Sequence, residues 1–196
     1  MTRRPAPANL HHHPDRIRRI VSINGPTPFG QEQLADRLAR NAQASPWFQW
    51  ILGAAAQGRL ENVLSELGYN ILSTLKLNGF ERNDLIDDTW LRAYGARFAT
   101  PADCAGAIGW ARGSADGAHR METPDAAARK TIAALPAMAI WGMADRTLRA
   151  EHFLPLFRDI YPRADIHALQ DAGHYSLEDD PRSIVRRLRS FLAGPA

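Results

Sequence analysis

The sequence predicts an α/β protein whose parallel sheet is interrupted by a long helical segment. Short apolar runs alternate with helical patterns near both ends of the chain, whereas residues 31–125 show helical patterns alone. A strand–helix–strand–helix order implies parallel strands joined by crossover helices. We expect an irregular N-terminal segment (1–13), a core strand and loop (14–30), an inserted helical subdomain (31–125) and a second core segment (126–196).

The composition is typical of a soluble globular protein. Apolar residues make up 45% of the 196 residues and charged residues 23%. The single cysteine, Cys104, excludes an intramolecular disulfide and suits a reducing compartment. The net charge of +3 comes from arginines scattered among acids. Because they form no basic stripe, we expect no nucleic-acid partner.

The sequence contains no signal peptide or membrane span that we can identify. MTRRPAPANL lacks a following apolar run, and the longest apolar stretch, AALPAMAIWGMA, has 12 residues and an internal proline. We therefore expect a cytoplasmic protein with no membrane partner. His11, His12 and His13 have no further ligands at helical or hairpin spacing, and no cofactor fingerprint occurs, so we predict neither a metal site nor a cofactor.

The first strand is predicted by RIRRIVSI, a β-branched run that ends at Asn24-Gly25-Pro26. Within the helical segment, Asn83 or Asp84 is the candidate N-cap of a helix that carries Trp90. Aromatic residues gather in this segment, and they either form its core or line a pocket for a small apolar substrate. The candidate pocket residues are Trp47, Phe48, Trp50, Trp90 and Trp110.

The C-terminal part predicts two more strands, each followed by a helix. The first is the run 137–141, and a helix with Phe153 and Phe157 on its apolar face follows it. The second strand covers 164–169. Asp180 then predicts the N-cap of a last helix, with proline at its first position.

Two residues that can do acid–base chemistry follow these strands directly. Asp145 lies four residues beyond Trp141, and His174 lies five residues beyond Leu169. Loops at the carboxyl ends of neighbouring parallel strands open on the same edge of a sheet. A carboxylate beside an imidazole fixes the ring tautomer and stabilises the imidazolium while the ring acts as a base.

Three stretches resemble one family. WGMAD (141–145) and DAGHYSLEDDP (171–181) resemble the acid and histidine motifs of the α/β-hydrolases, closest to the haloalkane dehalogenase and epoxide hydrolase branch. HPDRIRRIVSINGP (13–26) resembles the stretch into that family's sixth strand, after which the chain enters a cap. The resemblance covers residues 13–196. It implies the last three strands of the hydrolase sheet with an inserted all-helical cap, which is residues 31–125.

The resemblance also implies roles for individual residues. His174 would be the general base and Asp145 the triad acid. Some members of the family carry the acid after the sixth strand instead, where this chain has Asn24, and this favours Asp145. The family's reactions on haloalkanes, epoxides or esters need no cofactor.

The family's nucleophile is not found in this sequence. No glycine begins the G-x-S-x-G elbow or its aspartate or cysteine variants, and no histidine is followed by glycine, as the oxyanion loop requires. In the family these parts precede the sixth strand. We therefore expect the chain to be a C-terminal half, inactive alone, with an open edge on its first strand that favours aggregation.

Three explanations remain open. The chain could be a capped hydrolase that has lost its N-terminal half through truncation, a frameshift or a misplaced start. It could be a half-enzyme completed by a partner chain that carries the elbow. It could also be a non-catalytic binding or interaction protein that keeps the pocket of the cap.

Overall fold

The computed structural model describes residues 13–25, 32–60, 62, 79, 81–96, 100, 102 and 125–194. The secondary-structure elements in these residues are, in chain order, η1 (Pro14–Arg16), β1 (Ile20–Ile23), α2 (Glu32–Ala44), α3 (Pro46–Ala56), η2 (Asn83–Leu85), α6 (Asp88–Gly95), α8 (Ala126–Ala133), β2 (Ala137–Gly142), α9 (Ala150–Ile160), β3 (Asp165–Leu169), α10 (Ser176–Asp179) and α11 (Pro181–Ala193).

The three strands form one parallel sheet in the order β1-β2-β3. Ile23 of β1 pairs with Ile140 of β2, and Gly142 at the end of β2 pairs with Leu169 at the end of β3. The strands therefore end at one edge of the sheet, as the sequence predicts. The first strand is shorter than the predicted run RIRRIVSI, because only Ile20–Ile23 pair with β2, and Arg16 belongs to η1.

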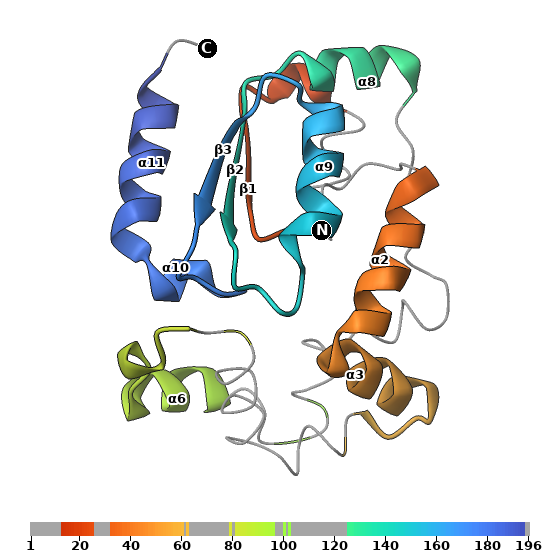
Figure 1. Cartoon of the computed structure of the whole chain (residues 1–196), viewed down its shortest axis with the longest axis vertical. Helices are drawn as coiled ribbons and strands as arrows, with labels where there is room; N and C mark the ends of the chain where they lie inside the picture. The colour runs from red at the N-terminus through yellow and green to blue at the C-terminus, as the bar shows by residue number, and fades with distance from the viewer. Residues whose placement is uncertain are drawn as a thin grey trace.

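Helices cover both faces of the sheet, with α9 on one side and α11 on the other (Figure 1). Every residue of β2 is buried, as expected for a central strand. Its side chains alternate between the two faces. Trp141 packs with Phe153 and Phe157 on the α9 side, whereas Met138 and Ile140 pack with Ile184 of α11. This central strand carries the loop with Asp145.

Residues 24–136, the β1–β2 connection, contain only helical elements wherever the structure describes them. Of these helices, α3 and α6 lie beyond the carboxyl ends of the strands (Figure 1). Helix α3 begins at Ser45, whose side chain accepts a hydrogen bond from the backbone N–H of Phe48. Helices α3 and α6 thus lie on the side of the sheet where the loops after β2 and β3 emerge.

The predicted N-cap residue of α6 is wrong. Asp87, and not Asn83 or Asp84, caps this helix, because its carboxylate accepts a hydrogen bond from the backbone N–H of Trp90 at 2.8 Å. Residues 83–85 form η2 instead, and Asp84 pairs with Arg82. Asn83, Asp84 and Asp87 can all cap a helix, and the fold of the chain places Asp87 at the helix start.

The last helix begins as predicted. The carboxylate of Asp180 accepts a hydrogen bond from the backbone N–H of Ser183 at 3.1 Å, and Pro181 is at the first helical position. Gly194 is at the C-cap. No helix among the described residues is long and apolar enough to cross a membrane.

Candidate active site

The structure brings the two predicted acid–base residues together. Asp145 is on the loop after β2 and His174 is on the loop after β3. The Nδ1 atom of His174 lies 2.9 Å from the Oδ2 atom of Asp145. Because an ionised carboxylate only accepts hydrogen bonds, this contact with such a carboxylate requires a proton on Nδ1. In a neutral ring Nε2 is then the acceptor.

The side chain of Asp145 has no solvent exposure and is held by four donors. Its Oδ1 accepts hydrogen bonds from the backbone N–H groups of Thr147 and Leu148, each at 2.7 Å. Its Oδ2 accepts one from the Nδ2 of Asn24 at 2.8 Å, besides the contact with His174. These contacts fix the orientation of the carboxylate, which is what a residue that aligns an imidazole requires.

Asn24 is a buried residue whose role the sequence analysis missed. Its Oδ1 accepts hydrogen bonds from the backbone N–H of Gly142 at 2.9 Å and from the hydroxyl of Ser176 at 2.8 Å. Its φ of 44° lies in the left-handed region, which asparagine tolerates better than most residues. The sequence analysis used Asn24 as the end of the first strand and as the position of an alternative acid, but it did not predict that the amide of Asn24 bonds Asp145.

His174 is partly accessible, with 22% of its side chain exposed, so a reacting group can reach the ring. The ring of Tyr175 lies edge-on to it, with 5.1 Å between the centroids. Burial, and then the negative charge of Asp145, raise the pKa of the Tyr175 phenol to about 12. Tyr175 is therefore neutral at physiological pH and adds no charge beside the imidazole.

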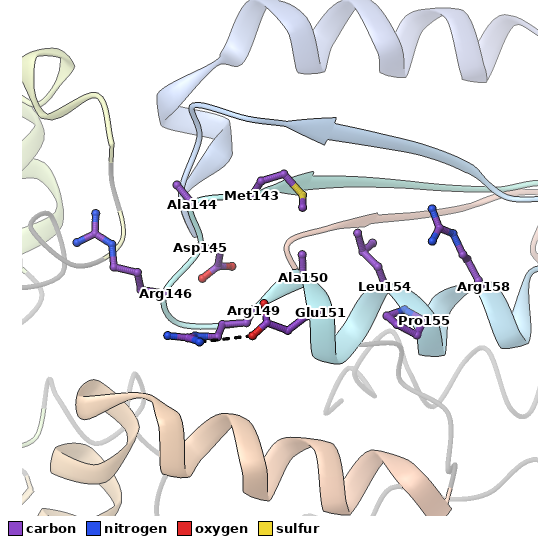
Figure 2. Close-up of a pocket in the computed structure, with 10 residues that line it drawn as sticks. All are labelled: Met143, Ala144, Asp145, Arg146, Arg149, Ala150, Glu151, Leu154, Pro155 and Arg158. Carbon is purple, nitrogen blue, oxygen red and sulfur yellow. Dashed lines mark hydrogen bonds and ion pairs between the residues drawn. The ribbon is translucent and has the colours of Figure 1, made fainter.

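A hollow of about 420 Å³ lies beside Asp145, between the β2–α9 loop and α9 (Figure 2). Ala150 and Leu154 form part of its wall. Arg146 points away from α9 and pairs with Glu81 of the β1–β2 connection. No group of three or more His, Cys, Asp or Glu side chains in the described part of the chain could hold a metal ion.

Four of the five predicted pocket aromatics are in the described residues, on helices α3 and α6. Trp47, Phe48 and Trp90 pack around Ile51 in a separate hydrophobic cluster. Trp50 stacks at a tilt on Trp47, with 5.1 Å between the centroids, and is 37% exposed. None of these four aromatic residues lines the hollow beside Asp145. Trp110 lies outside the described residues, so the role of these aromatics in substrate binding stays a prediction.

The β1–β2 connection is tied to the loop of the acid through Asn41 of α2. Asn41 is 1% exposed. Its Nδ2 donates to the backbone carbonyl of Thr147 at 2.7 Å, and its Oδ1 accepts from the backbone N–H of Arg149 at 3.1 Å. This amide therefore bonds both sides of the loop segment whose own N–H groups hold Asp145.

Two relatives have the same description. The chain is 25% identical over 186 residues to a cis-3-alkyl-4-alkyloxetan-2-one decarboxylase of Shewanella oneidensis, which covers 92% of this chain and 54% of that protein. It is 38% identical over 78 residues to the decarboxylase of that name from Xanthomonas campestris, which covers 40% of this chain and 26% of that protein. The chain thus spans about half the length of the first relative. No protein-family model matches the chain.

Two solved structures superpose on almost the whole chain and show its fold. An epoxide hydrolase from Bacillus megaterium superposes with a TM-score of 0.64 at 18% identity, over 96% of this chain and 66% of that one. An α/β-hydrolase from a deep-sea metagenome library superposes with a TM-score of 0.58 at 14% identity, over 97% of this chain and 62% of that one. With its three parallel strands and the loops after them, the chain has the fold of the C-terminal portion of an α/β-hydrolase.

Proposed function

We propose that His174 and Asp145 are the base and acid of a nucleophile–histidine–acid site that hydrolyses a small apolar electrophile. The observation that carries this proposal is the 2.9 Å contact between His174 Nδ1 and Asp145 Oδ2. That contact leaves Nε2 of a partly exposed ring as a proton acceptor, while the acid is held by four donors. Haloalkanes, epoxides and esters are the candidate substrates.

His174 and Asp145 would have the same roles with either type of nucleophile. With a serine, His174 Nε2 takes the hydroxyl proton as the oxygen attacks the carbonyl, and then gives the proton to the leaving group. With a carboxylate, the nucleophile displaces halide or opens the epoxide without the base and forms an alkyl ester. The halide leaves as an anion, whereas the epoxide oxygen takes a proton from an acid or water as its C–O bond breaks. Water then attacks that ester and gives its proton to Nε2. In both cases Asp145 stabilises the imidazolium.

The nucleophile and its oxyanion donors belong, in this proposal, to residues outside the present sequence. The first relative is about twice as long as the matched chain, in keeping with such a division. Strand β1 pairs with β2 alone among the described strands, and a further strand would, in this proposal, pair with its other side. A preceding segment of the same protein or a partner chain could supply it. The helices of the β1–β2 connection would then form a cap over the site.

The names of the two relatives favour a second candidate substrate. An oxetan-2-one is a strained four-membered cyclic ester, and the relatives' substrate carries two alkyl groups on that ring. Loss of carbon dioxide from the ring leaves an alkene, so the atoms balance without a cofactor. This decarboxylation would use the same apolar site and the same acid–base pair.

The test expresses the chain in two forms, alone and with the coding sequence that precedes residue 1. Each form is offered a p-nitrophenyl alkanoate, a terminal epoxide, a 1-haloalkane and a cis-3,4-dialkyloxetan-2-one. We expect turnover only from the longer form. His174→Ala should lower it by about 100- to 10,000-fold and Asp145→Asn by up to about 10,000-fold. Alkene and carbon dioxide as products would identify the decarboxylation.

The outcomes separate the alternatives. Turnover by the longer form that survives His174→Ala would disprove the proposed role of His174. Turnover only after addition of a separately encoded chain would indicate a half-enzyme completed by a partner. If neither form turns over any substrate but both bind apolar ligands, the non-catalytic explanation is favoured. An alkyl adduct that accumulates in His174→Ala, seen by mass spectrometry, would identify a carboxylate nucleophile, because a serine needs the base for the first step.

A further inference from the structure

One buried carboxylate joins the loop of His174 to a distant part of the chain. Asp179 is 4% exposed. Its Oδ2 accepts a hydrogen bond at 2.7 Å from the backbone N–H of Gly173, the residue before His174. Its Oδ1 accepts two more, from the backbone N–H groups of Glu81 at 3.0 Å and Arg82 at 2.8 Å. These two donors belong to the β1–β2 connection.

The two segments also touch along their backbones. The N–H of Tyr175 donates to the carbonyl oxygen of Gly79 at 3.0 Å. A Cβ atom added to Gly79 would lie 2.2 Å from the ring of Tyr175, and one added to Gly173 would lie 2.5 Å from the carbonyl oxygen of Gly79. Such distances leave no room for a methyl group. The contact therefore depends on glycine on both sides.

The same segment of the connection reaches the loop of the acid. Glu81 pairs with Arg146, the residue that follows Asp145. The backbone N–H of Glu81 is thus linked to the histidine loop through Asp179, and its side chain is linked to the acid loop through Arg146. Glu81 is therefore placed to act on both loops, and through them on the 2.9 Å contact.

We propose that Asp179 is a positioning residue that acts on His174 through Gly173. It holds Glu81 and Arg82 against the histidine loop. These residues and the sheet would then together set the distance between the imidazole and Asp145. This inference rests on the proposed role of His174 and Asp145. It predicts that a change on either side of the contact alters the state of the His174 ring, and not only the stability of the protein.

The test measures the ring-nitrogen and Nδ1–H signals of His174 by NMR on the full chain labelled with ¹⁵N-histidine. We compare Asp179→Ala and the isosteric Asp179→Asn with Glu178→Gln, a neighbouring acid for which no such link exists in the described residues. The Asp179 variants should shift or broaden the ring-nitrogen signals of His174 and its Nδ1–H proton. Exchange of the amide protons of Gly173, Glu81 and Arg82 should become about tenfold faster or more. Glu178→Gln should leave all these signals as in the wild type.

A second pair of variants perturbs the contact from the other side. Gly79→Ala pushes a methyl group into the ring of Tyr175, whereas Gly53→Ala in α3 meets no atom within 4 Å. We expect the first to shift the His174 signals and the second to leave them unchanged. Gly79→Ala also decides the question if the Asp179 variants do not fold.

Unchanged His174 signals in folded Asp179 or Gly79 variants would overturn the proposal, even if amide exchange rises, because only a structural role would then remain. The readout also separates this proposal from the proposed function. If the His174 signals move but turnover survives His174→Ala, the positioning role stands and the catalytic role fails. If turnover requires His174 but its signals do not respond to the two sets of variants, the opposite holds.

Discussion

The Nδ2 atom of Asn24 lies 2.8 Å from the Oδ2 atom of Asp145, the same oxygen that contacts His174. Asn24 follows β1, Asp145 follows β2 and His174 follows β3. The amide therefore joins the ends of all three strands in one buried network. An amide can donate to the carboxylate and still accept from Gly142 and Ser176, which a carboxylate at this position could not do.

Replacing Asn24 by aspartate should make stability depend on pH. Two buried carboxylates would then face each other at hydrogen-bonding distance, so one of them would stay protonated in the folded state with a raised pKa. A raised folded pKa gives stability that is present at low pH and lost as pH rises through that value. We expect Asn24→Asp to have a higher free energy of unfolding at pH 5 than at pH 8, measured by urea denaturation.

Asn24→Ala is the matched control, because it removes the same amide without adding a charge. It should lower the free energy of unfolding by about 2–4 kcal/mol, since buried partners lose their hydrogen bonds and alanine is less favourable at positive φ. That loss should be equal at the two pH values. A pH-independent Asn24→Asp variant would show that the two side chains do not meet in solution.

Asn41→Ala should loosen the loop that holds the acid. It removes both hydrogen bonds of a buried amide and leaves the carbonyl of Thr147 and the N–H of Arg149 without these partners. We expect a loss of about 1–3 kcal/mol in the free energy of unfolding. Exchange of the amide protons of Thr147 and Leu148, which donate to Asp145, should become faster in hydrogen–deuterium exchange.

Gln43→Ala serves as the control for Asn41→Ala, because Gln43 is exposed on the same helix. It should change stability by less than about 0.5 kcal/mol. Equal exchange of the loop amides in the two variants would mean that α2 does not support the acid loop.

The N-cap residue of α11, Asp180, should contribute less to the free energy of unfolding as the pH falls. Hydrogen bonding by Ser183 lowers the pKa of the Asp180 carboxyl below its ordinary value. A lowered folded pKa gives stability that is complete above the unfolded value of about 3.9 and is lost as pH falls through the folded value. Asp180→Ala should therefore cost about 1 kcal/mol at pH 7. The difference in the free energy of unfolding between Asp180→Ala and the wild type should become smaller below about pH 4.

Urea denaturation of the wild type and Asp180→Ala at several pH values measures this difference. The exposed Asp159 on α9 caps no helix, so Asp159→Ala should change stability by less than about 0.5 kcal/mol. If the cost of Asp180→Ala stays constant down to the lowest pH at which the protein folds, the ionised cap is not its source.

Adjacent acids show how far the sequence could predict this site. Asp180 was recognised as a cap because its donor, the N–H of Ser183, lies three positions away and Pro181 marks the helix start. The donors of Asp179 at Glu81 and Arg82 lie 98 and 97 positions away. No local pattern reports them. In sequence, Asp179 is therefore indistinguishable from an ordinary acid near a helix start, although the fold buries it.

For the rest of the fold too, features set by neighbouring residues were predictable and contacts between distant residues were not. The strands, and the position of Asp145 and His174 beyond two of them, follow from apolar runs and from the rule that parallel strands end at one edge. The networks around these residues depend on side chains of Asn24 and Asn41, which meet the acid loop only after the chain has folded. Their polarity is common in loops and helices, so burial was not predictable from their neighbours.

The side of β1 that pairs with no strand among the described residues gives the last prediction. Ile20 and Asn24 donate their backbone N–H groups to β2, at 3.0 Å from the oxygen of Pro136 and 3.1 Å from that of Ile140. Because successive N–H groups of a strand point to opposite sides, Ser22 also faces β2, whereas Val21 faces away from it. Unpaired groups on such an edge favour association with another strand.

We therefore expect the isolated chain to self-associate with increasing concentration, and Val21→Pro to reduce this association. Proline at an edge position whose N–H points outward removes a donor that the sheet does not use. Ser22→Pro is the control, since it removes a donor to β2 and should destabilise the fold by about 3 kcal/mol. Sedimentation velocity over a range of concentrations measures association, and circular dichroism measures folding. If folded Val21→Pro associates as strongly as the wild type, a surface other than the edge of β1 joins the chains.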